Sequence, residues 1–153
     1  MIETVQAEMG GLDILVSNAG LRRQTPFLEM KFDEWREILS VALDGAFLLA
    51  RASAPLMVER GGGAIVALSS VSHRVGTFNR CHVSAPKAGL EGLIRMLSRE
   101  LAPHGITCNC VVPGAIDTVR GTSAGARPAS GAAKTSLWNG LAASRRSPRW
   151  SGI

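Results

Sequence analysis

Apolar residues in this chain gather in short, strand-like runs that alternate with longer, helix-like stretches. The runs at 12–17, 64–68 and 106–112 are bounded by glycine, asparagine or proline. Short apolar runs with such boundaries are typical of strands buried on both faces of a parallel sheet. We therefore expect three strands at these positions.

Helical patterns separate the expected strands. The sequence predicts helices over 1–9, from 33 onward, over 45–59 and over 84–103, with Pro55 kinking the third and a loop at 70–82. Alternation of helix and strand implies right-handed crossovers and a parallel sheet with helices on both faces. The predicted fold class is α/β, with about three strands and flanking helices.

The pattern changes after residue 119. Residues 120–153 are rich in Gly, Ala, Ser and Arg and show no helix or strand period. We predict one domain over 1–119 and a disordered tail over 120–153. The abrupt change in composition near residue 128 suggests a frameshift as a hypothesis.

Charge follows the same division. The chain of 153 residues has a formal net charge of +5, yet its segment 118–153 holds six basic and no acidic residues. The basicity therefore belongs to the tail, and we expect no specific nucleic-acid partner.

The composition of the chain bears on where the protein is located and on whether it binds a metal ion. Hydrophobic residues make up 46% of the chain, but no uninterrupted run reaches ~18 residues, so we expect no membrane span. Residues 1–10 carry no basic residue, which argues against a secretory signal. Three cysteines without a C-x-x-C pair indicate free thiols in a reducing, cytoplasmic location. Cys108 and Cys110 share one face of a strand and are interpreted as core residues, so no metal site is expected.

The triplet Ser70-x12-Val83-x3-Lys87 is the most informative motif. It resembles the signature of the short-chain dehydrogenase/reductase family, in which a tyrosine stands at the middle position. The chain contains no tyrosine at all. The resemblance covers about residues 10–120 and implies the C-terminal portion of a Rossmann-type, doubly wound parallel sheet.

Three further motifs carry the resemblance in family order. Asn18-Ala19-Gly20 matches the family's N-A-G turn, Lys87-Ala88-Gly89-Leu90 opens the long helix, and residues 113–118 match P-G-x-I-x-T. The resemblance implies NAD or NADP as cofactor and a small carbonyl or alcohol substrate. It implies Ser70 and Lys87 as catalytic residues. The cofactor contacts that it implies are Asn18, Ala19, Gly20, Lys87, Pro113, Gly114, Ile116 and Thr118.

The chain also departs from the family pattern. It has no T-G-x-x-x-G-I-G turn, whose glycines let the backbone approach the pyrophosphate. Its first strand corresponds to the family's fourth, so we expect a truncated member. Ala42 stands where the family places an asparagine of the proton relay, and the family's last strand and closing G-G segment are missing. NAD cannot be distinguished from NADP, because the deciding residues belong to the missing part.

Valine cannot donate a proton, and the loss of a general acid typically lowers the rate ~100- to 10,000-fold. His82 is the candidate substitute, with an ordinary pKa near 6.5. About 140° separates positions 82 and 87 on a helix, so His82 reaches the site only if the helix starts at Ser84 and leaves it on a loop. Ser84 is interpreted as a helix cap, and His73 as a surface residue.

Three hypotheses remain open from the sequence. The chain is an atypical oxidoreductase, inactive or weakly active alone; a non-catalytic binding or assembly module; or the product of a damaged reading frame. The helices at 33–59 and 84–103 match those that pair across the family's dimer, which predicts a homo-oligomer. The sequence does not identify the substrate.

Overall fold

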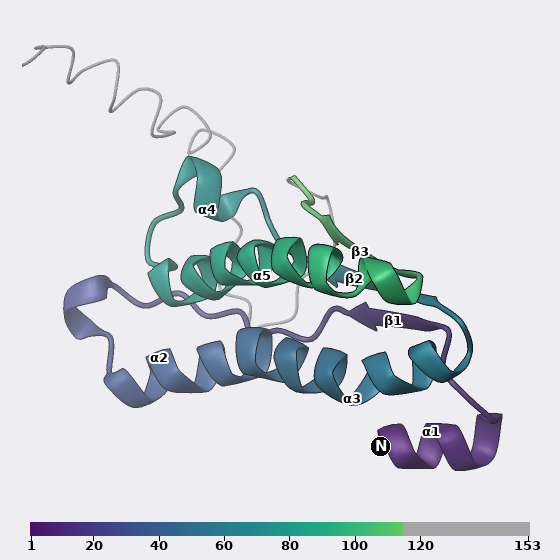
Figure 1. The fold of residues 1–153 in the computed structure, drawn as a ribbon. Coiled ribbons are helices and arrows are strands. Elements are labelled where there is room, and N and C mark those ends of the chain that lie inside the picture. Colours follow the sequence, from purple (N-terminus) through teal and green to yellow (C-terminus); the bar gives the residue numbers. More distant parts are fainter. Residues whose placement is uncertain (115–153) are drawn as a thin grey trace, which may run out of the picture.

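A computed structural model describes residues 1–114, apart from the side chain of Glu3. The expected tail, 120–153, lies outside the described residues, so its disorder remains a prediction. The helices are α1 (Ile2–Met9), α2 (Phe32–Leu39), α3 (Gly45–Glu59), α4 (Ser72–Val75) and α5 (Cys81–Glu100), and the strands are β1 (Ile14–Ser17), β2 (Gly63–Leu68) and β3 (Ile106–Val111). Within the described residues the sheet has three strands, and Figure 1 shows the long helices α3 and α5 beside it.

The sheet is parallel throughout, in the order β1-β2-β3. Leu15 pairs with Ile65, and Ile65 pairs with Cys108, so these three buried side chains form one row across the sheet. The expected α/β class and three parallel strands are confirmed.

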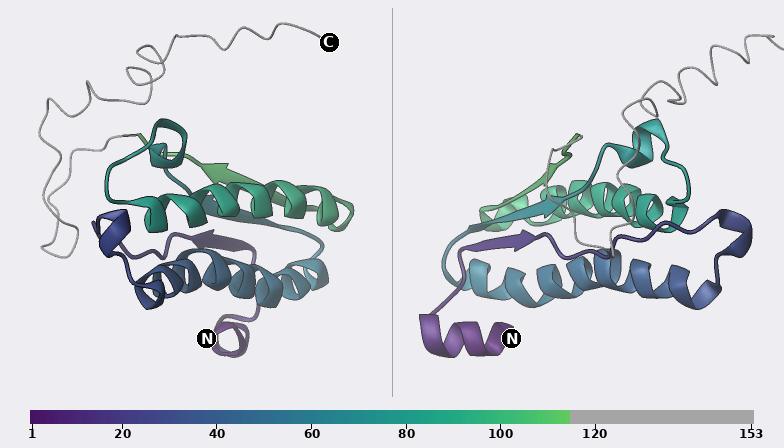
Figure 2. Two further views of the ribbon diagram at one scale, coloured as in Figure 1. Left: turned by 90° about the vertical axis from the view of Figure 1, so that its left-hand side faces the viewer. Right: turned by 180° about the vertical axis from the view of Figure 1, so that it is seen from behind.

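Helices α3 and α5 lie on the same face of the sheet in both views of Figure 2. Their residues Ala46, Ala50, Leu90 and Ile94 pack with the strands in one core. The expectation of helices on both faces is not met within residues 1–114. Both crossovers step across the sheet in the same direction, so a right-handed connection places both helices on one side.

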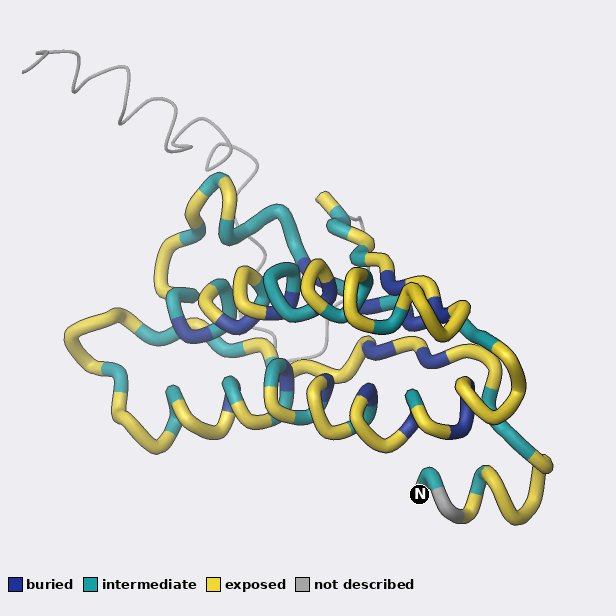
Figure 3. Tube along the Cα trace, viewed as in Figure 1, coloured by how far each residue is buried: buried dark blue, intermediate teal, exposed yellow. Residues whose placement is uncertain are grey.

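The opposite face of β1 is uncovered. Ile14 and Val16 are 62% and 58% exposed, whereas their neighbours Leu15 and Ser17 are buried. In Figure 3 the buried positions accordingly gather where the helices meet the sheet. As the sequence predicts, β1 is an apolar edge strand, which favours association with another chain.

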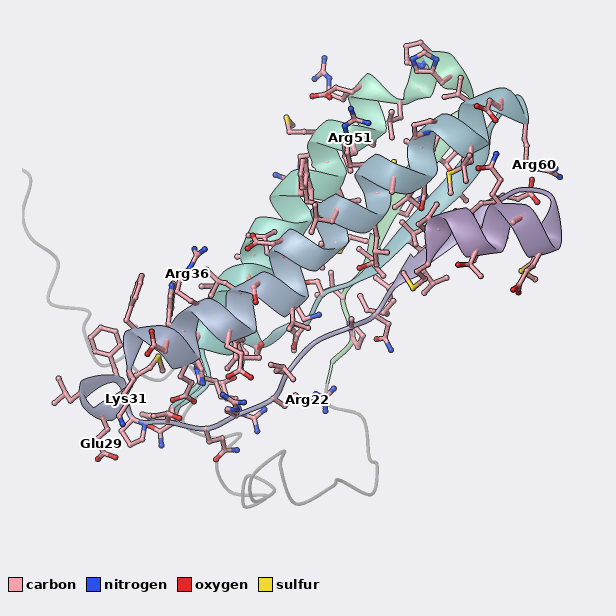
Figure 4. All side chains as sticks on the ribbon, turned by 90° about the horizontal axis from the view of Figure 1, so that it is seen from below. Arg22, Glu29, Lys31, Arg36, Arg51 and Arg60 are labelled. Atoms are coloured by element: carbon pink, nitrogen blue, oxygen red, sulfur yellow. The ribbon has the colours of Figure 1, made fainter. Side chains whose placement is uncertain are left out.

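Residues 32–59 form one continuous helix rather than two separate ones. A π-helical turn, Ser40–Asp44, joins α2 to α3, and Pro55 lies inside α3. Figure 4 shows Arg36 and Arg51 along this helix and Arg60 at its end, where Arg60 Nε lies 2.5 Å from Asp13 Oδ1 just before β1. The helix is long and apolar enough to cross a membrane by length and composition. Its buried side chains pack in the core, as in a core helix of a globular domain, and the absence of a membrane span stays a prediction.

Gly63 permits close contact between α3 and the start of β2. A Cβ at this position would lie 2.8 Å from both Asp13 O and Met57 Cγ. We expect Gly63→Ala to lower the free energy of unfolding by about 1–3 kcal/mol, because the core must shift to accept the methyl group. Chemical denaturation measures this.

Gly92→Ala is the matched control. Gly92 lies inside α5 and a Cβ there would meet nothing within 4 Å, so alanine should stabilise the protein by about 0.5–1 kcal/mol. Equal effects of the two substitutions would contradict the described contact at Gly63.

Candidate functional site at the carboxyl ends of the strands

The carboxyl ends of all three strands meet at one edge of the sheet. β1 leads into Asn18-Ala19-Gly20, β2 into Ser69-Ser70, and β3 into the Pro113-Gly114 turn. Two backbone hydrogen bonds join the last two segments, from Ser69 N to Val111 O (2.8 Å) and from Val71 N to Pro113 O (3.1 Å). Parallel sheets bind ligands at this edge.

Lys87 reaches this edge from α5. Its ammonium donates a hydrogen bond to Leu68 O, and a Cβ built on Gly20 would lie 3.9 Å from Nζ. Ser69 Oγ also donates to Lys87 O, at 3.1 Å. The lysine thus lies between the N-A-G turn and the serine segment, which the sequence separates by some fifty residues.

Burial lowers the pKa of Lys87 from its ordinary 10.5. Arg22, on the segment after β1 in Figure 4, lowers this pKa further by repulsion, and Cys110 opposes the change. A desolvated ammonium beside exposed turn residues is well placed to donate hydrogen bonds to ligand hydroxyls in place of water.

Ser70 is half-buried at the end of the serine segment. Its Oγ accepts a hydrogen bond from Ser72 N at 3.2 Å, which fixes the hydroxyl oxygen at the start of α4. A hydroxyl that accepts one bond can still donate its own hydrogen. Ser70 can therefore donate to a ligand oxygen at this edge.

Val83 is half-buried and stands one helical turn before Lys87 in α5. Positions four apart lie on the same face of a helix, so the valine occupies the position of the family's proton donor with a side chain that cannot ionise. Ala42 is buried in the π-helical turn and presents only a methyl group. A π-helical turn of this kind often marks a functional site.

His82 does not lie on a loop. Helix α5 begins at Cys81, because Arg80 O accepts hydrogen bonds from Val83 N (3.0 Å) and Ser84 N (2.9 Å) and closes the first turn. The predicted helix start at Ser84 is thus wrong. The His82 ring is fully buried, and its Nε2 lies 3.2 Å from Glu34 Oε1 of α2.

His73 is not the surface residue that the sequence suggested. Its side chain is 13% exposed and its Nε2 lies 3.3 Å from Glu91 Oε1, while Arg74 Nη2 lies 2.6 Å from Glu91 Oε2. The sequence reasoning missed Glu91, which follows Lys87 by four positions and so shares its helix face. The contact of Glu34 with His82 was not predicted from the sequence either.

The other predicted cofactor contacts differ in exposure, and two of them lie outside the described residues. Asn18, Ala19, Gly20 and Gly114 are exposed and Pro113 is half-buried, while Ile116 and Thr118 lie outside the described residues. Within residues 1–114 no three His, Cys, Asp or Glu side chains are grouped to hold a metal ion. Cys108 is buried and burial raises the pKa of its thiol, as suits a core residue.

The residues present fit one end of a dinucleotide. The N-A-G turn, the Ser70 hydroxyl and the Lys87 ammonium can surround a nicotinamide riboside with donors. Within residues 1–114, no strand leads through a glycine-rich turn into a helix N-terminus, the usual pyrophosphate cradle. The fit is therefore limited to the nicotinamide side.

An open parallel sheet with exposed turns at its carboxyl ends is the arrangement at which doubly wound α/β proteins bind nucleotides. The family described as "short chain dehydrogenase" matches residues 1–128. The chain belongs to this family, whose members use NAD or NADP.

Relatives support the assignment. The 3-oxoacyl-[acyl-carrier-protein] reductase FabG of Salmonella typhimurium is 40% identical over 118 residues, which is 77% of this chain and 48% of that protein. The FabG of Staphylococcus aureus strain Mu50 is 41% identical over 116 residues. The chain spans about half the length of the curated relatives it matches.

Solved structures agree. Acetoin dehydrogenase from Enterobacter cloacae is 46% identical, with a TM-score of 0.73 over 76% of this chain and 47% of that one. A gluconate 5-dehydrogenase from Burkholderia cenocepacia, in complex with NADP and tartrate, is 33% identical with a TM-score of 0.73, over 76% of this chain and 46% of that one.

Proposed function

We propose that residues 1–114 form the nicotinamide side of an NAD(P)-dependent oxidoreductase site for a carbonyl or alcohol substrate. The observation that carries this proposal is the position of the Lys87 ammonium, between the N-A-G turn and the serine segment. Two elements that are far apart in sequence thereby supply donors to one edge of the sheet.

The cofactor, when bound, supplies or accepts a hydride at the nicotinamide ring. Lys87 holds the ribose hydroxyls, and Ser70 donates a hydrogen bond to the substrate oxygen and polarises the carbonyl. Val83 cannot transfer the accompanying proton, so turnover is about 100- to 10,000-fold below that of a site with a positioned acid.

We assign the site to Ser70 and Lys87 rather than to His82. A catalytic role for His82 requires its ring to leave the buried contact with Glu34 and to turn across the helix toward Lys87. The role expected from the sequence stays a prediction that depends on such a movement.

The names of the relatives suggest a broad class of substrate. Their names specify a 3-oxoacyl-[acyl-carrier-protein], acetoin and gluconate, each of which carries a ketone or a secondary alcohol. Acetoin and gluconate are therefore the first compounds to test.

Nicotinamide fluorescence tests the proposal. We expect NADH emission to rise and shift to the blue on titration with the protein, and nicotinamide mononucleotide to compete while AMP does not, because the described contacts all belong to the nicotinamide side. Absence of any change at millimolar cofactor would remove the oxidoreductase proposal.

A second candidate function is assembly with another subunit through the helices expected at 33–59 and 84–103. Phe47, Leu48 and Met96 are between 50% and 62% exposed on α3 and α5, and apolar side chains on neighbouring helices favour a partner surface. Size-exclusion chromatography with light scattering should give a dimer or larger species, whereas a monomer at all concentrations would rule this candidate out.

A further inference from the structure

His82 enters a buried polar cluster beside the site. Its ring is 0% exposed, and Glu34 is its ion-pair contact, at 3.2 Å from Nε2. Apart from this contact, neither ring nitrogen has a polar partner within the described residues. A buried imidazole with one imperfect contact is costly to keep charged.

Glu34 connects this ring to the segment between β1 and α2. Its Oε1 also accepts a hydrogen bond of 2.7 Å from Thr25 Oγ1, and Thr25 N donates to Asn79 O at 2.9 Å. Thr25, Glu34, Asn79 and His82 come from four different segments. We call these four residues the His82 cluster.

The His82 cluster is connected to both sides of the site through short stretches of chain. Thr25 follows Gly20 by five residues, and His82 precedes Lys87 by five on the helix that supplies the ammonium. A shift of residues 21–31 away from α5 would therefore move the N-A-G turn relative to Lys87.

We propose that His82 is a positioning residue: its neutral ring, through Glu34 and Thr25, holds residues 21–31 against the start of α5, and protonation of the ring releases this segment. This inference concerns the packing of the chain itself and does not depend on the proposed oxidoreductase function.

Burial and the charges that face the ring together set the direction of the pH effect. Burial lowers the pKa of His82 below 6.5, Glu34 of α2 opposes this, and Arg23 and Arg80 reinforce it. The buried ring of His82 binds a proton less well than a ring that is exposed after residues 21–31 have moved away. The contact of 21–31 with α5 is therefore fully stable above pH about 6.5 and loses stability as the pH falls below it.

Amide hydrogen exchange measures the release directly. Between pH about 8 and about 5.5, either side of the ordinary imidazole pKa, we expect protection factors in 21–31 to fall about three- to tenfold relative to those in β2, as loss of one polar contact implies. His82→Phe keeps a ring of similar size without a titrating group, and should remove this pH dependence.

His73→Phe is the matched control, since it removes the second buried histidine–glutamate contact, at Glu91, and should leave the response of 21–31 unchanged. Should His82→Phe fail to fold, Glu34→Gln serves instead. Without the carboxylate the buried cation is still less favoured, so the acid-induced loss of protection should deepen. The proposal would be overturned if the ratio of protection factors in 21–31 to those in β2 were the same at both pH values. It would also be overturned if His82→Phe or Glu34→Gln showed the same pH response as the wild type.

Discussion

Val83→Tyr should raise the rate of carbonyl reduction about 100- to 10,000-fold, the usual contribution of a positioned general acid. The new phenol would stand one helical turn before Lys87, whose ammonium stabilises the phenolate and lowers the phenol's pKa toward neutrality. Initial rates of NADH oxidation with acetoin and other small ketones measure this gain.

Val83→Phe separates proton transfer from packing. It supplies the same ring without the hydroxyl and should leave the rate at the level of the starting protein. NADH affinity, measured for all three proteins, should agree within a few-fold. A tyrosine variant that binds NADH as the others do, yet reacts no faster than the phenylalanine variant, would show that position 83 does not face the reacting atoms.

Lys87→Met should weaken NADH binding about 10- to 100-fold. The substitution keeps the length of the apolar stem but removes the ammonium, and a hydrogen bond to a charged group contributes about 1.5–3 kcal/mol. Fluorescence titration measures the change. Lys31→Met is the control, because Lys31 is exposed at the start of α2 and its loss should alter the affinity little.

The contribution of Lys87 to NADH affinity should decrease as the pH rises. The ammonium form of Lys87 donates charge-assisted hydrogen bonds to ribose hydroxyls, which are stronger than those of the neutral amine, and burial lowers its pKa from 10.5. Affinity should therefore begin to decline at a lower pH than an exposed lysine would give. An affinity that is equal in wild type and Lys87→Met across the alkaline range would contradict the role of Lys87.

The sequence predicted the parallel sheet well because its signals are local. The continuous apolar run at 64–68 follows three glycines, and its length identifies it as a buried strand. The proximity of Gly20 and Lys87 could be expected only from the family resemblance, which implies both as cofactor contacts. No periodicity in the sequence relates positions so far apart.

Other features depend on tertiary contacts that a pattern does not carry. Helix α5 begins at Cys81, three residues before the predicted start at Ser84, because Arg80 O closes an earlier turn. The buried pairs His82–Glu34 and His73–Glu91 were missed for the same reason, since each joins residues from different segments of the fold. The face occupied by the helices depends on strand order, which alternation alone does not give.

The three strand ends and Lys87 should together bind the nicotinamide side of a cofactor. Backbone amide shifts on titration with reduced nicotinamide mononucleotide test this most directly. We expect the changes to gather at residues 18–20, 69–71, 87 and 114, and to diminish in Lys87→Met. Shifts scattered over the molecule, or gathered on the outer sides of α3 and α5, would contradict the claim.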